Sequence, residues 1–346
     1  SCANVLNVSV SGGNFASGEK SFGYFDATGT SFPFQNGIVL STGKIVNAQG
    51  PNTSLSDDGG NMGWNGDPDL NQALGLSNTF NATVLEFDFI PLGNRISFDY
   101  IFSSEQYLSN PMSNQCNFTD GFAFLLRRNG ETNYQNLAVV PNTNIPVKVN
   151  TVRGSGTICP AANETYFDAF NGTVHPTNFN GQTKVLTAQS DVIPGETYHI
   201  KLVIADEGNH RFDSAIFLGG GSFNFGIDIG DDRLIATGNP LCPNETLAVD
   251  ATQIGATSYQ WYKDTNLIPG ATNATYNITS AGDYLVEINY GPTCQTTGAI
   301  KIEYAETLIV NQNTFTECDA DANQDGKTVF DLNNIKNQLF TNLPAN

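Results

Sequence analysis

The chain has 346 residues and a formal net charge of −19, and its Asp and Glu residues are scattered along the sequence rather than gathered in a tail. Nucleic acid and anionic lipid attract basic surfaces, so this charge argues against either one as a partner. Charged residues make up only 14% and aromatic residues 11%, while Asn, Thr, Ser and Gly are abundant, a mixture typical of many short strands joined by turns.

The first 80 residues are predicted to be rich in loops. One apolar strand is expected over residues 38–40, and a long stretch rich in Gly, Asn and Asp follows it. Long loops without hydrophobic periodicity are usually either functional or mobile.

Clear strands begin at residue 83. In "TVLEFDFIPL", Leu85, Phe87 and Phe89 alternate with Glu86 and Asp88. The same alternation recurs in "RISFDYIFSSEQY", "DGFAFLLRR" and "ETYHIKLVIAD", and "SAIFLGGGSFNFGI" closes the region. Alternation with one apolar face predicts antiparallel sheets that are buried on one side. We therefore expect an all-β protein in which residues 1–228 form a jelly-roll-like β-sandwich.

A second module is predicted over residues 229–306, where the strands become shorter and more closely spaced. This segment carries Cys242, Trp261, Tyr284 and Cys294 in that order. A Trp between two cysteines, with a Tyr on a late strand, is typical of an immunoglobulin-like sandwich. The spacing departs from antibody domains, because Cys294 follows Tyr284 by far more than two residues.

Residues 307–346 are too few to build a core, so we expect them to begin a third module. Their segment "CDADANQDGKTVFDL" is similar to a calcium loop, with oxygen ligands at alternate positions and Gly326 at the sharp turn. The predicted ligands of calcium are Asp321, Asn323, Asp325, a backbone carbonyl near Lys327, and Asp331. The closing Asp stands one position earlier than the Glu of an EF-hand, which resembles dockerin-like loops. The alternative is an acidic turn that binds no metal.

Four acids are expected at the ends of two hairpins. Glu105 follows one strand and Asp120 precedes the next, and Asp206 and Asp213 flank the second hairpin in the same way. If the hairpins are neighbours, the four carboxylates converge at one edge of the sandwich, where a cation or Arg211 would balance their charge. The alternative is that each acid caps a loop by accepting hydrogen bonds from backbone amides.

Some of these acids are also candidates for catalysis, because two opposed carboxylates suffice for glycoside hydrolysis. The candidates are Glu86, Glu105, Asp120 and Asp206. Their spacing does not distinguish an acid from a nucleophile, and the sequence has no nucleophile elbow, P-loop or HExxH motif. We therefore expect that the protein is not an enzyme.

The segment "NMGWNGDPD" contains the candidate ligand-binding residues Trp64, Asn65, Asp67 and Asp69. An exposed Trp beside hydrogen-bonding side chains is suited to stacking on a sugar ring. The alternative is a Trp that packs over the end of a sheet.

The cysteine pattern points to an oxidising compartment. The six cysteines are Cys2, Cys116, Cys159, Cys242, Cys294 and Cys318. None forms a CxxC pair and there are only three histidines, which argues against zinc and favours disulfides. No segment reaches the roughly 20 apolar residues that cross a bilayer, and a chain that starts at Ser1 fits a processed N-terminus.

Several ordered motifs resemble the choice-of-anchor L domain over roughly residues 4–225. They are "GIVLSTGKIVNAQGPN", "GDPDLNQALG", "VLEFDFIPLGNRISFDYIFSSEQY", "FTDGFAFLL", "LAVVPNTNIPVKVNTV" and "TYHIKLVIADEGNHRFDSAIFLGGGSF". Members tend to carry two adjacent acids in "SEEY", where this chain has Glu105 followed by Gln106, which weakens a metal role assigned there by analogy. Residues 240–304 resemble Ig/PKD-like modules, and residues 315–346 resemble repeats of proteins exported by the type IX secretion system.

The resemblance implies a secreted protein displayed on the surface of Bacteroidetes-type bacteria, often as an adhesin or a gliding-associated protein. The secretion machinery would act through a C-terminal sorting region, and the chain contains no visible one. The disulfide pairs expected in this setting are Cys116–Cys159 and Cys242–Cys294.

The leading hypothesis is a non-enzymatic adhesin that binds a glycan or a surface protein through the edge near residues 50–70 and 105–120, with calcium stiffening the junction to the next module. The alternatives are a structural subunit of a surface layer or filament and a carbohydrate-active enzyme.

Overall fold

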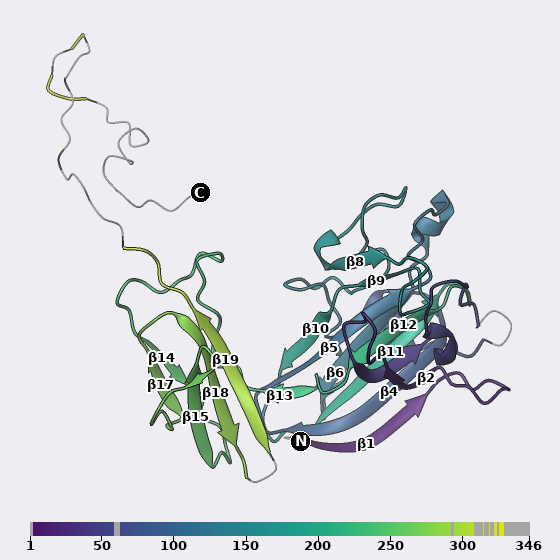
Figure 1. Ribbon diagram of the computed structural model, residues 1–346, viewed down its shortest axis with the longest axis horizontal. Coiled ribbons are helices and arrows are strands. Elements are labelled where there is room, and N and C mark those ends of the chain that lie inside the picture. The colour runs from purple at the N-terminus through teal and green to yellow at the C-terminus, as the bar shows by residue number, and fades with distance from the viewer. Residues whose placement is uncertain are drawn as a thin grey trace. The chain divides into compact units, whose positions relative to one another are not determined.

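The computed structural model of the chain describes residues 3–58, 63–291 and 294–307, together with residues 314, 318, 322, 323 and 325–328. The predicted all-β fold is confirmed, since antiparallel sheets make up nearly all of the regular structure (Figure 1). The chain divides into two compact units, one built mainly from residues 1–228 and one that begins at residue 229.

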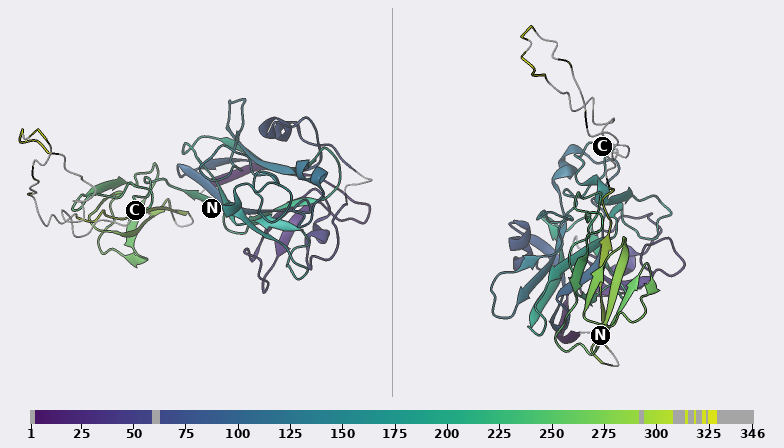
Figure 2. Two further views of the ribbon diagram at one scale, coloured as in Figure 1. Left: turned by 90° about the horizontal axis from the view of Figure 1, so that it is seen from above. Right: turned by 90° about the vertical axis from the view of Figure 1, so that its left-hand side faces the viewer.

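The first unit is a sandwich of two antiparallel sheets (Figures 1 and 2). The first sheet has the strand order β1 (Ala3–Ser11), β4 (Thr79–Pro91), β11 (Tyr198–Glu207), β6 (Gly121–Arg128) and β7 (Gln135–Asn136). The second sheet has the order β2 (Phe22–Asp26), β3 (Asn36–Ser41), β12 (Ser214–Gly219), β5 (Arg95–Ser104), β9 (Gly181–Thr183) and β8 (Phe167–Phe170). Strands β10 (Leu186–Asp191) and β13 (Asn224–Gly226) also pair with β5.

The core between these sheets follows the alternation seen in the sequence. Phe122 and Phe124 of β6 pack against Tyr100 of β5, with ring centroids 4.9–5.4 Å apart. Phe89 of β4 belongs to the same fully buried cluster. Aromatic pairs at these distances contribute beyond the apolar area that they bury.

The outer face of the first sheet is covered in part by the helix α1 (Pro68–Leu74). The Asp67 side chain accepts a hydrogen bond from the Leu70 amide at its start, and Gly75 ends it in the left-handed conformation. Leu70 and Leu74 are buried against Ala123 and other small or aliphatic side chains of the sheet. This second apolar layer explains why β6 is buried on both faces over most of its length.

The outer face of the second sheet is covered by loops and by the short 3-10 helix η1 (Ile45–Ala48). Phe32, Phe179 and Phe217 form the centre of this layer. Two further 3-10 turns, η2 (Ser113–Asn117) and η3 (Glu164–Tyr166), lie in the loops of the unit.

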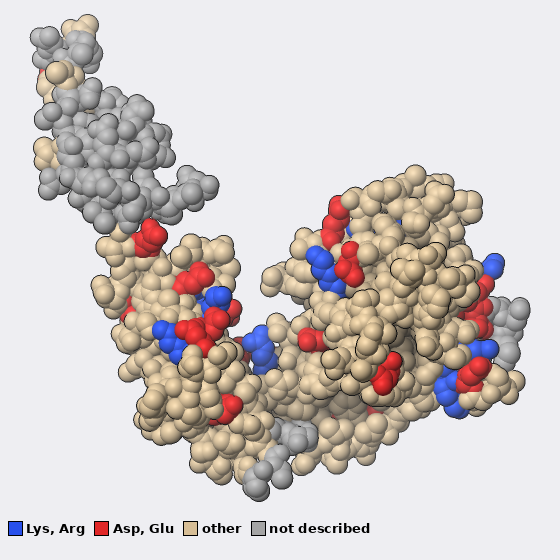
Figure 3. Space-filling model, viewed as in Figure 1, with Lys and Arg blue, Asp and Glu red and all other residues tan. Residues whose placement is uncertain are grey.

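The charged side chains on the face shown in Figure 3 are dispersed among neutral ones.

The second unit contains a pair of strands, β14 (Leu247–Asp250) and β17 (Thr275–Ile278), and a sheet with the order β16 (Asn266–Leu267), β15 (Ser258–Lys263), β18 (Gly282–Asn289) and β19 (Gln295–Ile302). Trp261 is fully buried, donates from its indole nitrogen to the Asn273 carbonyl at 2.9 Å and stacks on Tyr276. The Tyr284 hydroxyl donates to the Ser280 carbonyl at 3.0 Å.

The predicted disulfide Cys116–Cys159 is confirmed and joins two loops of the first unit. The predicted disulfide Cys242–Cys294 is wrong, because Cys242 is an exposed free thiol and Cys294 is disulfide-bonded. Neither residue lies within a strand, since Cys242 precedes β14 and Cys294 precedes β19. They are therefore not placed as the cysteines of an immunoglobulin core, which face each other from opposite sheets.

The described part of the chain contains no helix that is long and apolar enough to cross a membrane.

Candidate functional site

The four acids expected at the hairpin ends lie together at one end of the first sandwich. Glu105 directly follows β5, Asp120 directly precedes β6, Asp206 is near the end of β11, and Asp213 directly precedes β12. None of the four side chains is more than 1% exposed. The four acids converge as expected, but the two expected hairpins do not form, because β5 pairs with β12 in the second sheet and β6 pairs with β11 in the first.

Two of these carboxylates hold the strand ends together. Asp120 accepts hydrogen bonds from the Gln106 side-chain amide at 2.9 Å, the Glu207 backbone amide at 3.2 Å and the Ser214 hydroxyl at 2.7 Å. Asp206 accepts from the Asn81 side-chain amide at 2.8 Å.

The other two carboxylates hold a loop. Glu105 accepts from the Ser56 backbone amide at 2.7 Å, and Asp213 accepts from the Asp58 backbone amide at 3.0 Å. The Asp58 side chain in turn accepts from the Asn47 side-chain amide at 2.6 Å, in η1. The acids thus tie the loop around residues 56–58 to the end of the sandwich.

Burial decides the protonation of this cluster. Burial, with Asp213 as a further negative neighbour, raises the pKa of Glu105 to about 8 and that of Asp120 to about 8. Burial and the charges of Asp120 and Asp213 raise the pKa of Asp206 well above its ordinary value. The cluster therefore keeps protons at neutral pH that exposed carboxyl groups would release.

The residues that the structure describes include no group of three or more His, Cys, Asp or Glu side chains arranged to hold a metal ion. Arg211, the other expected source of positive charge, pairs with Asp57 at 2.9 Å instead. The contacts of Glu105, Asp120 and Asp213 with backbone amides are those of loop-capping acids, the alternative named above.

The residues of the predicted aromatic loop are engaged in the fold. The Trp64 indole nitrogen donates to the Ala82 carbonyl at 2.7 Å, and its ring meets Phe15 edge-on at 5.8 Å. Lys201 pairs with Asp67 at 2.6 Å and with Asp69 at 2.7 Å. Asn65 forms an isolated β-bridge with Phe80 and has an exposed side chain. Trp64 is only half-buried, so ligand binding by this loop stays a prediction.

Of the predicted calcium loop, Asp321 and Asp331 lie outside the described residues. The described part is a tight turn in which Asp325 accepts from the Lys327 backbone amide at 3.1 Å and from the Asn323 side chain at 3.4 Å. Calcium binding by this loop therefore also stays a prediction.

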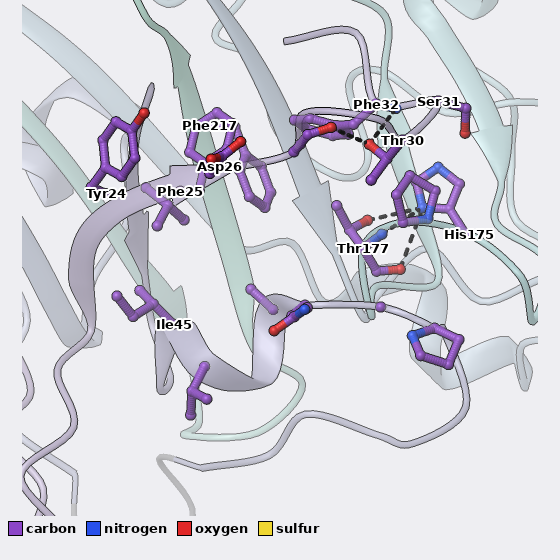
Figure 4. Close-up of a pocket in the computed structure, with 18 of the residues that line it drawn as sticks. Tyr24, Phe25, Asp26, Thr30, Ser31, Phe32, Ile45, His175, Thr177 and Phe217 are labelled. Atoms are coloured by element: carbon purple, nitrogen blue, oxygen red, sulfur yellow. Dashed lines mark hydrogen bonds between the residues drawn. The ribbon is translucent and has the colours of Figure 1, made fainter. Parts of the chain in front are cut away.

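A hollow of about 690 Å³, which the sequence did not reveal, lies over the outer face of the second sheet (Figure 4). It is bounded by β2, the loop that follows β2, η1, and the loop around residues 174–177. Phe25, Phe32 and Phe217 form an aromatic cluster along one wall, with ring centroids 5.0–5.9 Å apart and edge-to-face geometry.

The rim of this hollow is polar. Tyr24 is exposed, and it lies at the opposite end of the hollow from His175 in Figure 4. The backbone amide of Thr177 donates to His175 Nδ1 at 3.1 Å, and burial lowers the pKa of His175, so the imidazole is neutral at pH 7. The hydrogen bond from the Thr28 amide lowers the pKa of Asp26, which is therefore ionised.

An aromatic wall beside a carboxylate, hydroxyl groups and a neutral imidazole offers stacking and directional hydrogen bonds to one small ligand. One segment of the sequence could have indicated this hollow. It is "SFGYFDATGTSFPF", which places five aromatic residues around a turn.

Residues 1–224 match the family model of the Choice-of-anchor L domain. No curated protein matches the chain.

Proposed function

Since the chain belongs to the Choice-of-anchor L domain family and is therefore a surface-associated or secreted protein, we propose that it is an adhesin whose first unit binds a glycan in the aromatic hollow. The observation that carries this proposal is the hollow of about 690 Å³, with an aromatic wall of Phe25, Phe32 and Phe217 and a polar rim. Sugar rings present apolar faces to aromatic side chains and hydroxyl groups to polar ones.

The second unit serves as a stalk in this proposal. Its buried Trp261 and the hydrogen bond from Tyr284 to an upstream carbonyl support an immunoglobulin- or PKD-like module. The proposed location is the outer cell surface of a Bacteroidetes-type bacterium, reached through the type IX secretion system, and gliding is one activity that such an adhesin would serve.

We propose a binding protein rather than a carbohydrate-active enzyme. Asp26 is the single carboxylate among the residues that line the hollow, whereas glycoside hydrolysis requires two opposed ones. The four clustered acids are fully buried and hydrogen-bonded within the fold, where no sugar reaches them.

The full chain is expected to bind selected glycans on an array, and binding is expected to persist in EDTA. The reason is that the hollow offers a stacking wall and hydrogen-bonding groups but only one carboxylate. Tyr24→Ala should weaken binding of the selected glycan by on the order of tenfold, since one aromatic contact contributes about 1 kcal/mol.

The matched control for Tyr24→Ala is Ile254→Ala, which truncates a side chain that is 86% exposed and does not line the hollow. A lack of glycan binding in both buffers would contradict the glycan proposal and favour a structural subunit. Binding that EDTA abolishes would show that the glycan binds through a metal ion rather than in the hollow.

Calcium is the proposed ligand of the loop that contains Asn323, Asp325 and Lys327. The side chain of Lys327 is 84% exposed, so trypsin has access to it. Calcium should slow cleavage after Lys327, because a site formed only in the ordered loop adds its binding energy to that order.

Magnesium is the control ion for this experiment, since it prefers a smaller octahedral site. Asp325→Ala should remove the effect of calcium on the cleavage rate. Equal cleavage rates in calcium, magnesium and EDTA would show that the segment is an acidic turn without a metal.

A further inference from the structure

Strand β1 is an open edge of the first sheet. It has nine residues, and its one neighbour in the sheet order is β4 (Figure 1). Every residue from 4 to 11 is exposed. An edge strand presents a row of backbone amides and carbonyls to which another strand can pair.

The two faces of β1 differ in chemistry. Val5 lies opposite Phe89 and Val10 opposite Leu85, and directly opposite residues of an antiparallel pair share a face. Because Phe89 is fully buried in the core, these valines face the space between the sheets, and Val8 shares their face by alternation with Val10. On the outer face, the polar side chains of β1 bond to acids of β4, as Asn7 does to Asp88 at 2.7 Å.

The valines remain exposed although they face the interior side. Val8 is 62% exposed, and Val5 and Val10 are exposed as well. The edge strand of the second sheet, β2, is shorter than the edge strand of the first, since β2 has five residues and β1 has nine. The valine row continues through Leu85 and Phe87 into an apolar cavity of about 230 Å³ that Phe98 and Leu202 also line.

The strand lacks charged or proline residues, which protect most natural edge strands. The first charged side chain of the whole sequence is that of Glu19. The one irregularity of β1 is a bulge between Leu6 and Ser9, at Asn7 with a positive φ of 50°.

We propose that β1 pairs antiparallel with β1 of a second copy of this chain, which joins the two first sheets into one continuous sheet. The net charge of the chain favours this surface as the contact between two copies. Two copies that each carry a net charge of −19 repel one another, and the seam between two β1 strands is free of charged side chains.

The nearest acids behind the seam already have hydrogen-bond partners within the chain. Asp88 accepts from Asn7 and from His199 at 2.8 Å, and Glu86 accepts from Ser9 at 3.1 Å. Two copies of β1 can also pair with each other. A register that sets Val5 of one copy opposite Val10 of the other keeps the valines of both copies on one face of the joined sheet. Such a two-fold contact is closed and yields a dimer rather than a fibre.

The test is sedimentation equilibrium of the full chain over a wide concentration range, after alkylation of the free thiols so that no intermolecular disulfide forms. The native sequence is expected to dimerise. Val8→Lys should weaken dimerisation by on the order of 100-fold, because it buries ammonium groups in an apolar seam. The matched control Val174→Lys changes the charge identically at a side chain that is 91% exposed elsewhere, and should leave the dimer intact.

Hydrogen exchange of the β1 amides supplies a second readout, since protection in the native sequence should rise with protein concentration and protection in Val8→Lys should not. A native chain that is monomeric at every concentration would overturn the proposal and leave the edge to a strand of a different protein. A Val8→Lys dimer as tight as the native one would overturn it equally, because the interface would then lie elsewhere.

Discussion

Asp120→Asn is expected to unfold with a higher free energy than the native sequence at pH 8 and with a similar free energy near pH 4. Burial raises the pKa of Asp120 from its ordinary value of 3.8 to about 8, so between these pH values the folded state holds a proton that the unfolded state has released. The contribution of this group to stability is therefore fully present below about pH 4 and is lost as the pH rises to about 8. An Asn holds no such proton and removes this loss.

The expected gain at pH 8 is on the order of a few kcal/mol, since each unit of pKa shift corresponds to about 1.4 kcal/mol. The amide fits the site. Its oxygen can accept from Gln106 and Glu207, and its nitrogen can donate to the Ser214 hydroxyl, whose own proton is then free to go to Ser104 Oγ, 2.8 Å away. Removal of the Asp120 carboxyl group also makes the ionisation of Asp206 easier, because the charge of Asp120 raises the pKa of Asp206.

Denaturant unfolding between pH 4 and pH 8.5 measures this effect, and Asp26→Asn is the matched control. Asp26 is exposed and a hydrogen bond from Thr28 lowers its pKa, so its loss should not flatten the fall in stability above pH 5. Parallel stability profiles for Asp120→Asn and the native sequence would show that Asp120 ionises normally in the folded protein.

Gly43→Ala is expected to destabilise the first unit by about 3 kcal/mol or more, the range of severe overpacking. A Cβ atom at residue 43 would lie 2.0 Å from Asp213 Oδ2 and 2.5 Å from its Cγ. Neither side has room to move, because both residues are buried and Asp213 holds the Asp58 amide. Loss of this contact should also loosen the loop around residues 56–58.

The control is Gly172→Ala, where an added Cβ meets no atom within 4 Å. Asp213→Ala in the Gly43→Ala background should recover part of the lost stability, because it removes the colliding carboxylate. A double variant that is no more stable than Gly43→Ala alone would show that the strain has another source.

The sequence was sufficient to place the acid cluster but not to assign its role. Alternation defines the strands. Glu105, Asp120 and Asp213 lie directly beside strand ends, and Asp206 lies near the end of β11, in strands that become neighbours in the sandwich. Their partners come from loops, as the Ser56 and Asp58 amides do, and loops have no period from which to predict a contact.

The hollow and the pairing of Cys242 and Cys294 could not be predicted from the sequence, for related reasons. Phe25 and Phe217 are far apart in the chain and meet only because β3 lies between β2 and β12 in the second sheet. Cys242 and Cys294 had the order of immunoglobulin cysteines but not their positions on strands, and spacing alone does not determine a pairing.

The wall and the rim of the hollow belong to different parts of the fold. Phe32 and Phe217 are buried in the layer that covers the second sheet, whereas Tyr24, Gln49 and Val174 are exposed rim residues on three separate segments. Substitutions at the rim leave the buried layer unchanged, so the selectivity proposed for this hollow can change without loss of the scaffold. For protein engineering, these rim positions are where a randomised library would yield new binding specificities on an intact sandwich.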